Sequence, residues 1–194
     1  MGESVDCLKN LAFACQEVDS PIRTRCLETM TNITKFPGNG PYLANCSEAI
    51  QALSEGATSD NDDDRVWALR SLQNITADAP NKVELATSSF LEIISSCAVR
   101  LEIEDEQEAA ISIMLNLSTE PGTIVQFTST KSVVANLVRI VNIDDYSPDV
   151  QFMACDIMCT ISMWLQNLSH GGSIPVGITG LPLPSHVSTG HMRW

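Results

Sequence analysis

The feature that most limits how this chain can fold is a repeat of 42 residues. Three segments align without gaps: TRCLETMTNIT at 24–34, VWALRSLQNIT at 66–76 and EAAISIMLNLS at 108–118. Each has an asparagine at the same place, and 42 residues separate Asn32 from Asn74 and Asn74 from Asn116. A fourth segment, FMACDIMCTIS at 152–162, fits after a two-residue insertion, with Thr160 in place of the asparagine. We expect the chain to stack about four copies of one unit.

Each repeated segment has the apolar pattern of an α-helix. Relative to the asparagine, apolar residues occur at positions −6, −5, −2 and +1, which in the second copy are Ala68, Leu69, Leu72 and Ile75. These positions form one stripe along a helix. The helix starts are marked by N-cap residues, first-turn prolines or first-turn acids at 20–21, 62–64 and 147–149.

One further helix precedes the first long helix, and two precede each of the others. Apolar stripes predict a second helix in each unit, at 5–15, 47–57, 88–101 and 132–142. Brief apolar stretches follow the Pro- and Gly-containing linkers and predict a short extra helix at 41–46, 82–87 and 123–128. One unit is therefore a short helix, a longer helix and then the longest helix.

A three-helix unit of about 42 residues resembles the armadillo repeat. The resemblance covers roughly residues 5 to 168, and the segment ALRSLQNITADAPNKVEL at 68–85 is similar to the family's junction between third and first helices. It implies an all-α, right-handed superhelical solenoid of armadillo-type three-helix repeats, with a repeat domain at 1–169 and a tail at 170–194. HEAT repeats, which share the size but have two helices, are the alternative.

The last long helix, 148–168, is apolar on almost every side. Such a helix belongs inside a stack, because an end helix would expose apolar side chains to water. Three kinds of cover stay open: the C-terminal tail, another subunit, or further units of a longer solenoid of which this chain is a fragment. The tail 170–194 holds all three histidines and no acid, and we expect it to be irregular. It is either a mobile terminus or a cap that folds back through Leu181, Leu183 and Trp194.

The formal net charge of −13 restricts the partners. An acidic surface repels phosphate backbones, so nucleic acid is not an expected partner. A peptide or protein with a basic surface is the natural match; the alternative is that the acidity only keeps the chain soluble. No run of 18 apolar residues occurs, which predicts that no helix spans a membrane.

Cysteine usage indicates the compartment. The chain has seven cysteines, an odd number, and no C-x-x-C motif. No signal peptide opens the sequence, since the first residues are acidic and lack a long apolar stretch. Free cysteines without a secretion signal predict a reducing interior compartment, the cytoplasm or the nucleus.

The sequence offers little for catalysis. It contains none of the phosphate-binding, metalloprotease or nucleophile-elbow motifs. All histidines lie in the tail, so no Cys–His or Ser–His pair can be placed on the repeats. Cys155 and Cys159 lack two further soft ligands for zinc, and the acidic run 60–64 lacks the glycine and glutamate of a calcium loop. We therefore expect no cofactor, no metal and no enzymatic activity.

The resemblance implies where a partner would bind. In armadillo proteins the third helices line a concave groove, and their asparagines hydrogen-bond the partner's backbone. The positions that match here, together with their neighbours four and seven residues earlier, are Asn32, Asn74, Asn116, Glu28, Arg70, Ser112, Asp156, Arg25 and Trp67. The nuclear-import adaptors of the family place tryptophans four residues before the asparagines, and these are missing here. Two alternatives stay open: the asparagines bond neighbouring helices instead, and Trp67 lies either in the groove or in the core.

These observations favour a protein-binding adaptor or scaffold that presents a concave helical groove to a partner segment. The alternative is a noncatalytic regulatory or assembly subunit, such as a chaperone cofactor. The apolar last helix motivates this alternative, because its surface requires lasting cover.

Overall fold

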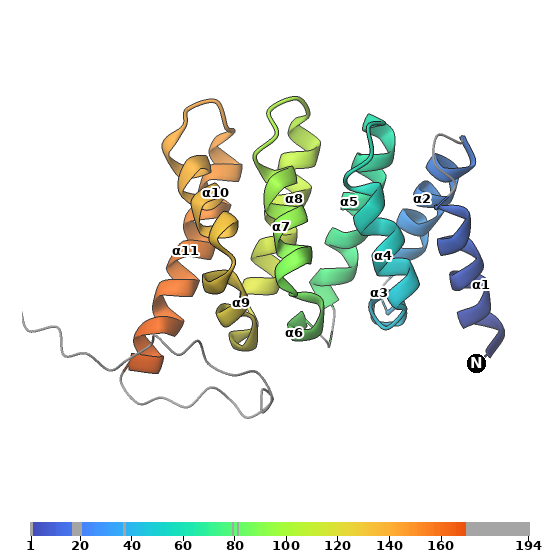
Figure 1. Cartoon of the computed structure of the whole chain (residues 1–194), viewed down its shortest axis with the longest axis horizontal. Coiled ribbons are helices and arrows are strands. Elements are labelled where there is room, and N and C mark those ends of the chain that lie inside the picture. Colours follow the sequence, from blue (N-terminus) through green and yellow to red (C-terminus); the bar gives the residue numbers. More distant parts are fainter. Residues whose placement is uncertain (1, 17–20, 37, 79, 81, 170–194) are drawn as a thin grey trace, which may run out of the picture.

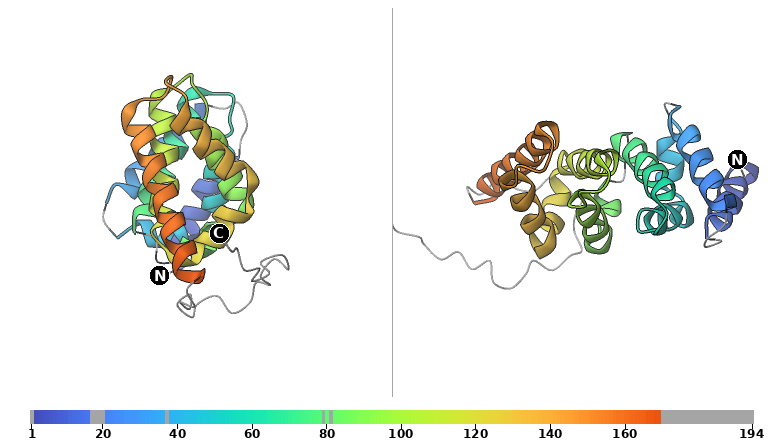
Figure 2. Two further views of the ribbon diagram at one scale, coloured as in Figure 1. Left: turned by 90° about the vertical axis from the view of Figure 1, so that its left-hand side faces the viewer. Right: turned by 90° about the horizontal axis from the view of Figure 1, so that it is seen from above.

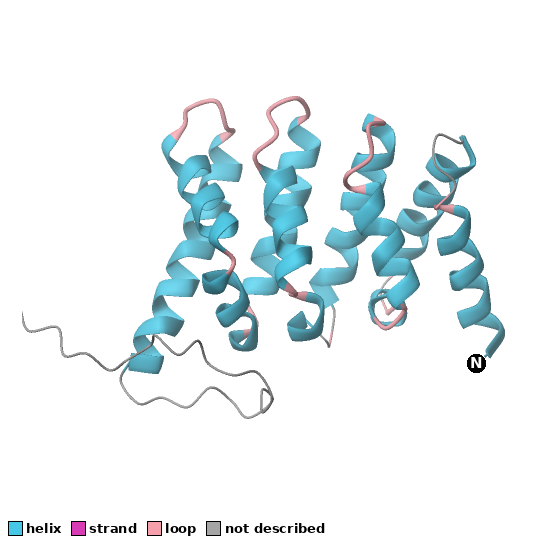
Figure 3. Cartoon of the chain, in the orientation of Figure 1, coloured by secondary structure: helices cyan, strands magenta, loops and turns pink. Residues whose placement is uncertain are grey.

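We describe the protein from a computed structural model, which places residues 2–16, 21–36, 38–78, 80 and 82–169. Helices account for most of these residues, and none of the residues described is in a strand (Figure 3). The all-α prediction is confirmed. The expected tail at 170–194, with its cap residues Leu181, Leu183 and Trp194, lies outside the described residues.

The helices occur in the predicted order of short, longer and longest. The long helices are α2 (Pro21–Thr34), α5 (Asp62–Asp78), α8 (Glu104–Ser118) and α11 (Pro148–Ser169). The second helices are α1 (Gly2–Ala14), α4 (Ser47–Gly56), α7 (Ser88–Ala98) and α10 (Lys131–Asn142). The short helices are α3 (Gly40–Ala44), α6 (Lys82–Leu85) and α9 (Ile124–Ser129), the last preceded by the 3-10 turn η1 (Pro121–Thr123).

The helices form an elongated stack with two layers. The units follow one another along the long axis of the molecule, from α1 and α2 at one end to α10 and α11 at the other (Figure 1). Seen from above, the long helices make one layer and α1, α4, α7 and α10 make the other (Figure 2). Within the long-helix layer α2 packs on α5, α5 on α8 and α8 on α11. The contacts between long helices thus run from each unit to the next.

The predicted apolar stripe forms the core. In the second unit Ala68, Leu69, Leu72 and Ile75 are all fully buried. The layers approach closely at Gly56 of α4, where a Cβ atom would lie 2.9 Å from the Cβ of Ala68. A side chain at this position would force the layers apart, so the glycine sets their spacing.

Local hydrogen bonds fix where the helices begin. The Asn61 side chain accepts a hydrogen bond from the backbone N–H of Asp64 at 3.1 Å, which caps α5. The Ser147 hydroxyl accepts from the backbone N–H of Val150 at 3.4 Å at the start of α11. These caps set the register of the long helices and thus which side chains reach the surface.

In the described part of the chain, no helix combines the length and apolarity that a membrane span requires.

Candidate functional site

All nine predicted site residues lie on the four long helices. We call the exposed face of α2, α5, α8 and α11 the long-helix surface. Because these helices are adjacent in the stack, the predicted residues all lie in one layer of it, although they come from four separate units (Figure 1).

A hollow of about 750 Å³ lies between α2 and α5 on this surface. Its lining combines charged, polar and aromatic side chains: Pro21, Thr24, Arg25, Glu28, Asn61, Asp63, Asp64 and Trp67. Three of these residues, Arg25, Glu28 and Trp67, were predicted from the repeat. The Arg25 side chain is 81% exposed and donates from Nη1 to Glu28 Oε2 at 2.8 Å. The rim of the hollow is therefore held by a solvent-exposed ion pair.

Trp67 lies both in the core and at the surface. Its side chain is half-buried and packs against the apolar core, yet it lines the hollow. The guanidinium carbon of Arg70 lies 5.8 Å from the centroid of its ring, within cation–π range. Arg70 also pairs with Asp105 of α8, with Nη2 2.5 Å from Oδ2. The predicted residues Trp67 and Arg70 thus form one cluster with Asp105, and this cluster joins two units.

The asparagine ladder has a structural role at two of its three positions. Asn74 Nδ2 donates to the hydroxyl of Thr34 on the preceding long helix at 3.0 Å. Asn116 Nδ2 donates in the same way to Thr76, at 3.3 Å, and also to a carbonyl of α5. Asn32, which has no preceding long helix, is exposed and accepts from Lys35 Nζ at 3.2 Å. These amide N–H groups bond neighbouring helices, which supports that alternative for Asn74 and Asn116.

The last two predicted residues lie farther along the surface. The Ser112 hydroxyl on α8 donates to the sulfur of Met153 on α11 at 3.5 Å. Asp156 is exposed on α11. Neither residue lines the hollow between α2 and α5. The structure therefore divides the predicted site into six residues on α2 and α5 and three on α8 and α11, namely Ser112, Asn116 and Asp156.

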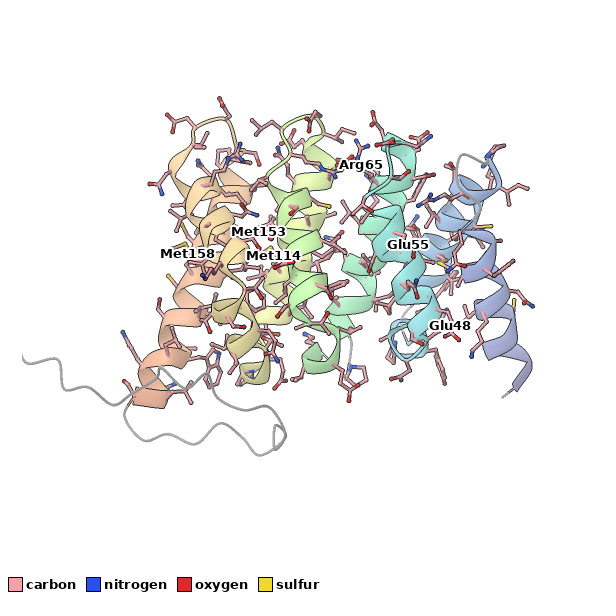
Figure 4. The ribbon with its side chains drawn as sticks, in the orientation of Figure 1. Glu48, Glu55, Arg65, Met114, Met153 and Met158 are labelled. Carbon is pink, nitrogen blue, oxygen red and sulfur yellow. The ribbon has the colours of Figure 1, made fainter. Side chains whose placement is uncertain are left out.

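Our reading of the sequence missed a second repeated feature, a buried ion pair at successive junctions. Arg65, which is labelled in Figure 4, donates from Nε to Glu106 Oε1 at 2.7 Å between α5 and α8. Arg23 lies 3.4 Å from Asp64 at the same place between α2 and α5. The signal was present, because 42 residues separate Arg23 from Arg65 and Asp64 from Glu106.

Burial shifts the pKa values of both members of the Arg65–Glu106 pair. Desolvation raises the pKa of Glu106 above its usual value, although the Arg65 and Arg100 guanidinium groups favour the ionised form. Burial lowers the pKa of Arg65, but its hydrogen bonds to Asp62 and Glu106 outweigh that effect and leave it raised. Arg65 thus keeps its charge, and the pair joins two units.

The long-helix surface presents a half-buried tryptophan, exposed ion pairs and the exposed amide of Asn32. Among the described residues, no group of three or more His, Cys, Asp and Glu side chains is placed to hold a metal ion.

No protein-family model matches the sequence, and no curated protein sequence matches it either. Solved structures do match in fold. One is an engineered protein from the Northeast Structural Genomics Consortium, with a TM-score of 0.64, 17% identity, and coverage of 86% of this chain and 68% of the other. A second engineered protein from that consortium has a TM-score of 0.69 and 17% identity, and the match covers 85% of this chain and 41% of the other. At this identity the likeness concerns the fold alone.

Proposed function

We propose that this chain is a right-handed armadillo-type solenoid that binds a segment of another protein along its long-helix surface. It acts as an adaptor or scaffold and has no catalytic activity of its own. The observation that carries the proposal is the hollow between α2 and α5, in which the predicted residues Arg25, Glu28 and Trp67 meet.

The shape of the surface supports a partner in extended form. The long helices lie side by side along the stack, so equivalent side chains recur once per helix. A helix neighbour lies about 8–10 Å away, the length of about three extended residues. An extended segment that crosses the helices would meet one set of side chains roughly every third residue.

Charge supports a basic partner. The whole chain carries a net charge of −13. At the hollow, Arg25 is paired with Glu28, whereas the carboxylate of Asp63 lines the hollow from the first turn of α5. A lysine or arginine of the partner would meet the carboxylate of Asp63.

Selection from a library of displayed 15-residue peptides tests the proposal. We expect the selected peptides to be basic and to bind more weakly as salt rises. Asp63→Lys should lower the affinity for the selected peptides about tenfold, which corresponds to about 1.4 kcal/mol of binding free energy.

Glu92→Lys is the matched control. Glu92 is exposed on α7, in the other layer, and the substitution changes the net charge by the same amount. If both variants weaken binding equally, the effect comes from overall charge and the proposed site is wrong. Circular dichroism establishes that both variants are folded.

A noncatalytic assembly subunit is the second candidate, and one observation favours it. On α11, Phe152 is 67% exposed, Met163 51% and Leu165 45%. Several exposed apolar side chains on one helix are typical of interaction surfaces. If this is the function, peptides selected on the protein should compete poorly with the natural partner, and Asp63→Lys should leave assembly intact.

A further inference from the structure

Each junction between long helices joins two distinct sets of side chains. At the junction of α2 and α5, the side chains of α2 that reach α5 are Arg23, Thr24, Thr31 and Thr34; we call these and their equivalents the trailing set. The residues of α5 that receive them are Asp64, Ser71 and Asn74, which with their equivalents form the leading set. The repeat assigns both sets to every long helix.

The trailing set of α11 has no following helix in the described stack. Its members are Gln151, Phe152, Cys159 and Ser162. Phe152, Cys159 and Ser162 are all exposed, whereas on α2 the equivalents of the last two, Thr31 and Thr34, are buried. Elsewhere α11 packs on α8, α9 and α10, and its Val150, Ala154, Ile157 and Ile161 are buried.

On α2, the exposed set is the leading set instead of the trailing set. Its members are Ile22, Thr29 and Asn32, and all three are exposed. Cys26 and Ile33, which lie on the same side, are half-buried, while their equivalents Ala68 and Ile75 on α5 are fully buried. One end of the stack thus presents a leading face and the other end presents a trailing face (Figure 1).

The two faces match in their polar groups. At the internal junctions the asparagine of a leading set donates to a hydroxyl of the trailing set: Asn74 to Thr34 and Asn116 to Thr76. The leading face of α2 offers Asn32, and the trailing face of α11 offers the hydroxyl of Ser162. The same bond can therefore form between them.

The faces also match in charge. Where Arg23 meets Asp64 inside the stack, the trailing face has Gln151 and the leading face has Ile22. Joining the faces would bury no unpaired charge at this place, which removes the largest cost of such a contact.

We propose that the trailing face of α11 binds the leading face of α2 in a second copy of the chain, so that copies associate end to end. The contact is heterologous and leaves one free face at each end, so association continues beyond two copies as concentration rises. Each copy carries a charge of −13, so repulsion opposes association and added salt strengthens it. This proposal does not depend on the partner-binding function.

Single substitutions at the two faces test this directly. Thr29 and Cys159 are the equivalents of Ser71 and Thr31, whose hydroxyls lie 2.7 Å apart. Both are exposed, so an arginine at either position is tolerated by the monomer. In sedimentation velocity, the mass of the wild-type chain should rise at least about twofold with concentration, and Thr29→Arg and Cys159→Arg should each stay monomeric. A mixture of the two variants should form a one-to-one dimer and stop there, because each supplies one intact face.

Leu101→Arg is the matched control, since Leu101 is 47% exposed between α7 and α8 and away from both faces. It should associate like the wild type. A wild-type chain that stays monomeric at all concentrations, as when its own tail covers α11, overturns the proposal. A dimer abolished by Cys159→Arg but not by Thr29→Arg also overturns it, because that pattern indicates two α11 faces in contact.

A disulfide reports the register. With Thr29→Cys, oxidation of two thiols by diamide should link position 29 of one copy to Cys159 of the next, as mass mapping of peptides would show. A bond between two Cys159 residues as the dominant product would contradict the proposed contact.

Discussion

At the scale of single residues, the junction of α5 and α8 contains two ion pairs in opposite environments. The Arg65 and Glu106 side chains are 10% and 1% exposed, whereas those of Arg70 and Asp105 are 43% and 55% exposed. A buried charge that loses its partner keeps its desolvation cost, and an exposed one is solvated by water. The two pairs therefore contribute very differently to stability.

We expect Glu106→Ala to lower the free energy of unfolding by about 3–5 kcal/mol, because it leaves the Arg65 charge buried beside fewer partners. Asp105→Ala should cost less than about 1 kcal/mol. Urea denaturation followed by circular dichroism measures both. Equal losses in the two variants would mean that the Arg65 pair is not buried as the structure has it.

The cysteines give a pH-dependent prediction. Burial raises the pKa of the Cys15 thiol to about 12 and that of Cys97 to about 11, whereas Cys7 and Cys159 are exposed. At pH 8 only about one Cys15 side chain in 10,000 is a thiolate, and the thiolate is the nucleophile. Iodoacetamide should therefore modify Cys7 and Cys159 first, and Cys15 and Cys97 only after unfolding. Peptide mass mapping over time checks the order of modification. Early alkylation of Cys97 would show that α7 unfolds locally and exposes this thiol.

Sequence reasoning at this scale succeeded where the repeat constrained it. The stripe of Ala68, Leu69, Leu72 and Ile75 is buried as predicted, because helical periodicity alone fixes one side of a helix. The Arg65–Glu106 pair was missed although its spacing was visible. A charged residue in a helix is normally solvent-exposed, so only the neighbouring unit reveals that it is buried.

At the scale of the helices, the asparagines join each long helix to the preceding one. Asn74 and Asn116 make this bond, and Asn32 at the end of the stack does not. Asn74→Ala should lower the free energy of unfolding by about 1 kcal/mol, since it removes a hydrogen bond and leaves the Thr34 hydroxyl with one partner fewer.

Asn32→Ala serves as the control and should change stability by less than about 0.5 kcal/mol. If the two variants are equally stable, the asparagines do not hold the helices together and their amides are available for a partner, as the resemblance implied.

The order and type of the helices were predictable, and their contacts with one another were not. Pro–Gly linkers and apolar stripes located the short helices such as α3 and α6. The Trp67–Arg70 stack and the hollow beside it depend on side-chain rotamers and on α2 being next to α5, which a single sequence does not specify. For that reason the candidate residues were found, but not which of them meet.

At the scale of the whole molecule, the period of 42 residues explains the stack. Each unit leaves an apolar side that only its neighbour can cover, so identical units must pile up in series. The same logic accounts for the exposed faces at the two ends, where Ile22 and Phe152 are 58% and 67% exposed. The armadillo type of the stack and the partner remain proposals that rest on the resemblance and on the long-helix surface.

The central claim is that a partner lies across the long-helix surface, and photo-crosslinking tests it most directly. A benzophenone amino acid is placed at Arg25 in one variant and at Glu92 in another; both positions are exposed, on opposite layers of the stack. With a basic peptide selected from the library, we predict a covalent adduct from position 25 and none from position 92. Adducts from position 92 alone, or equally from both positions, would contradict the account.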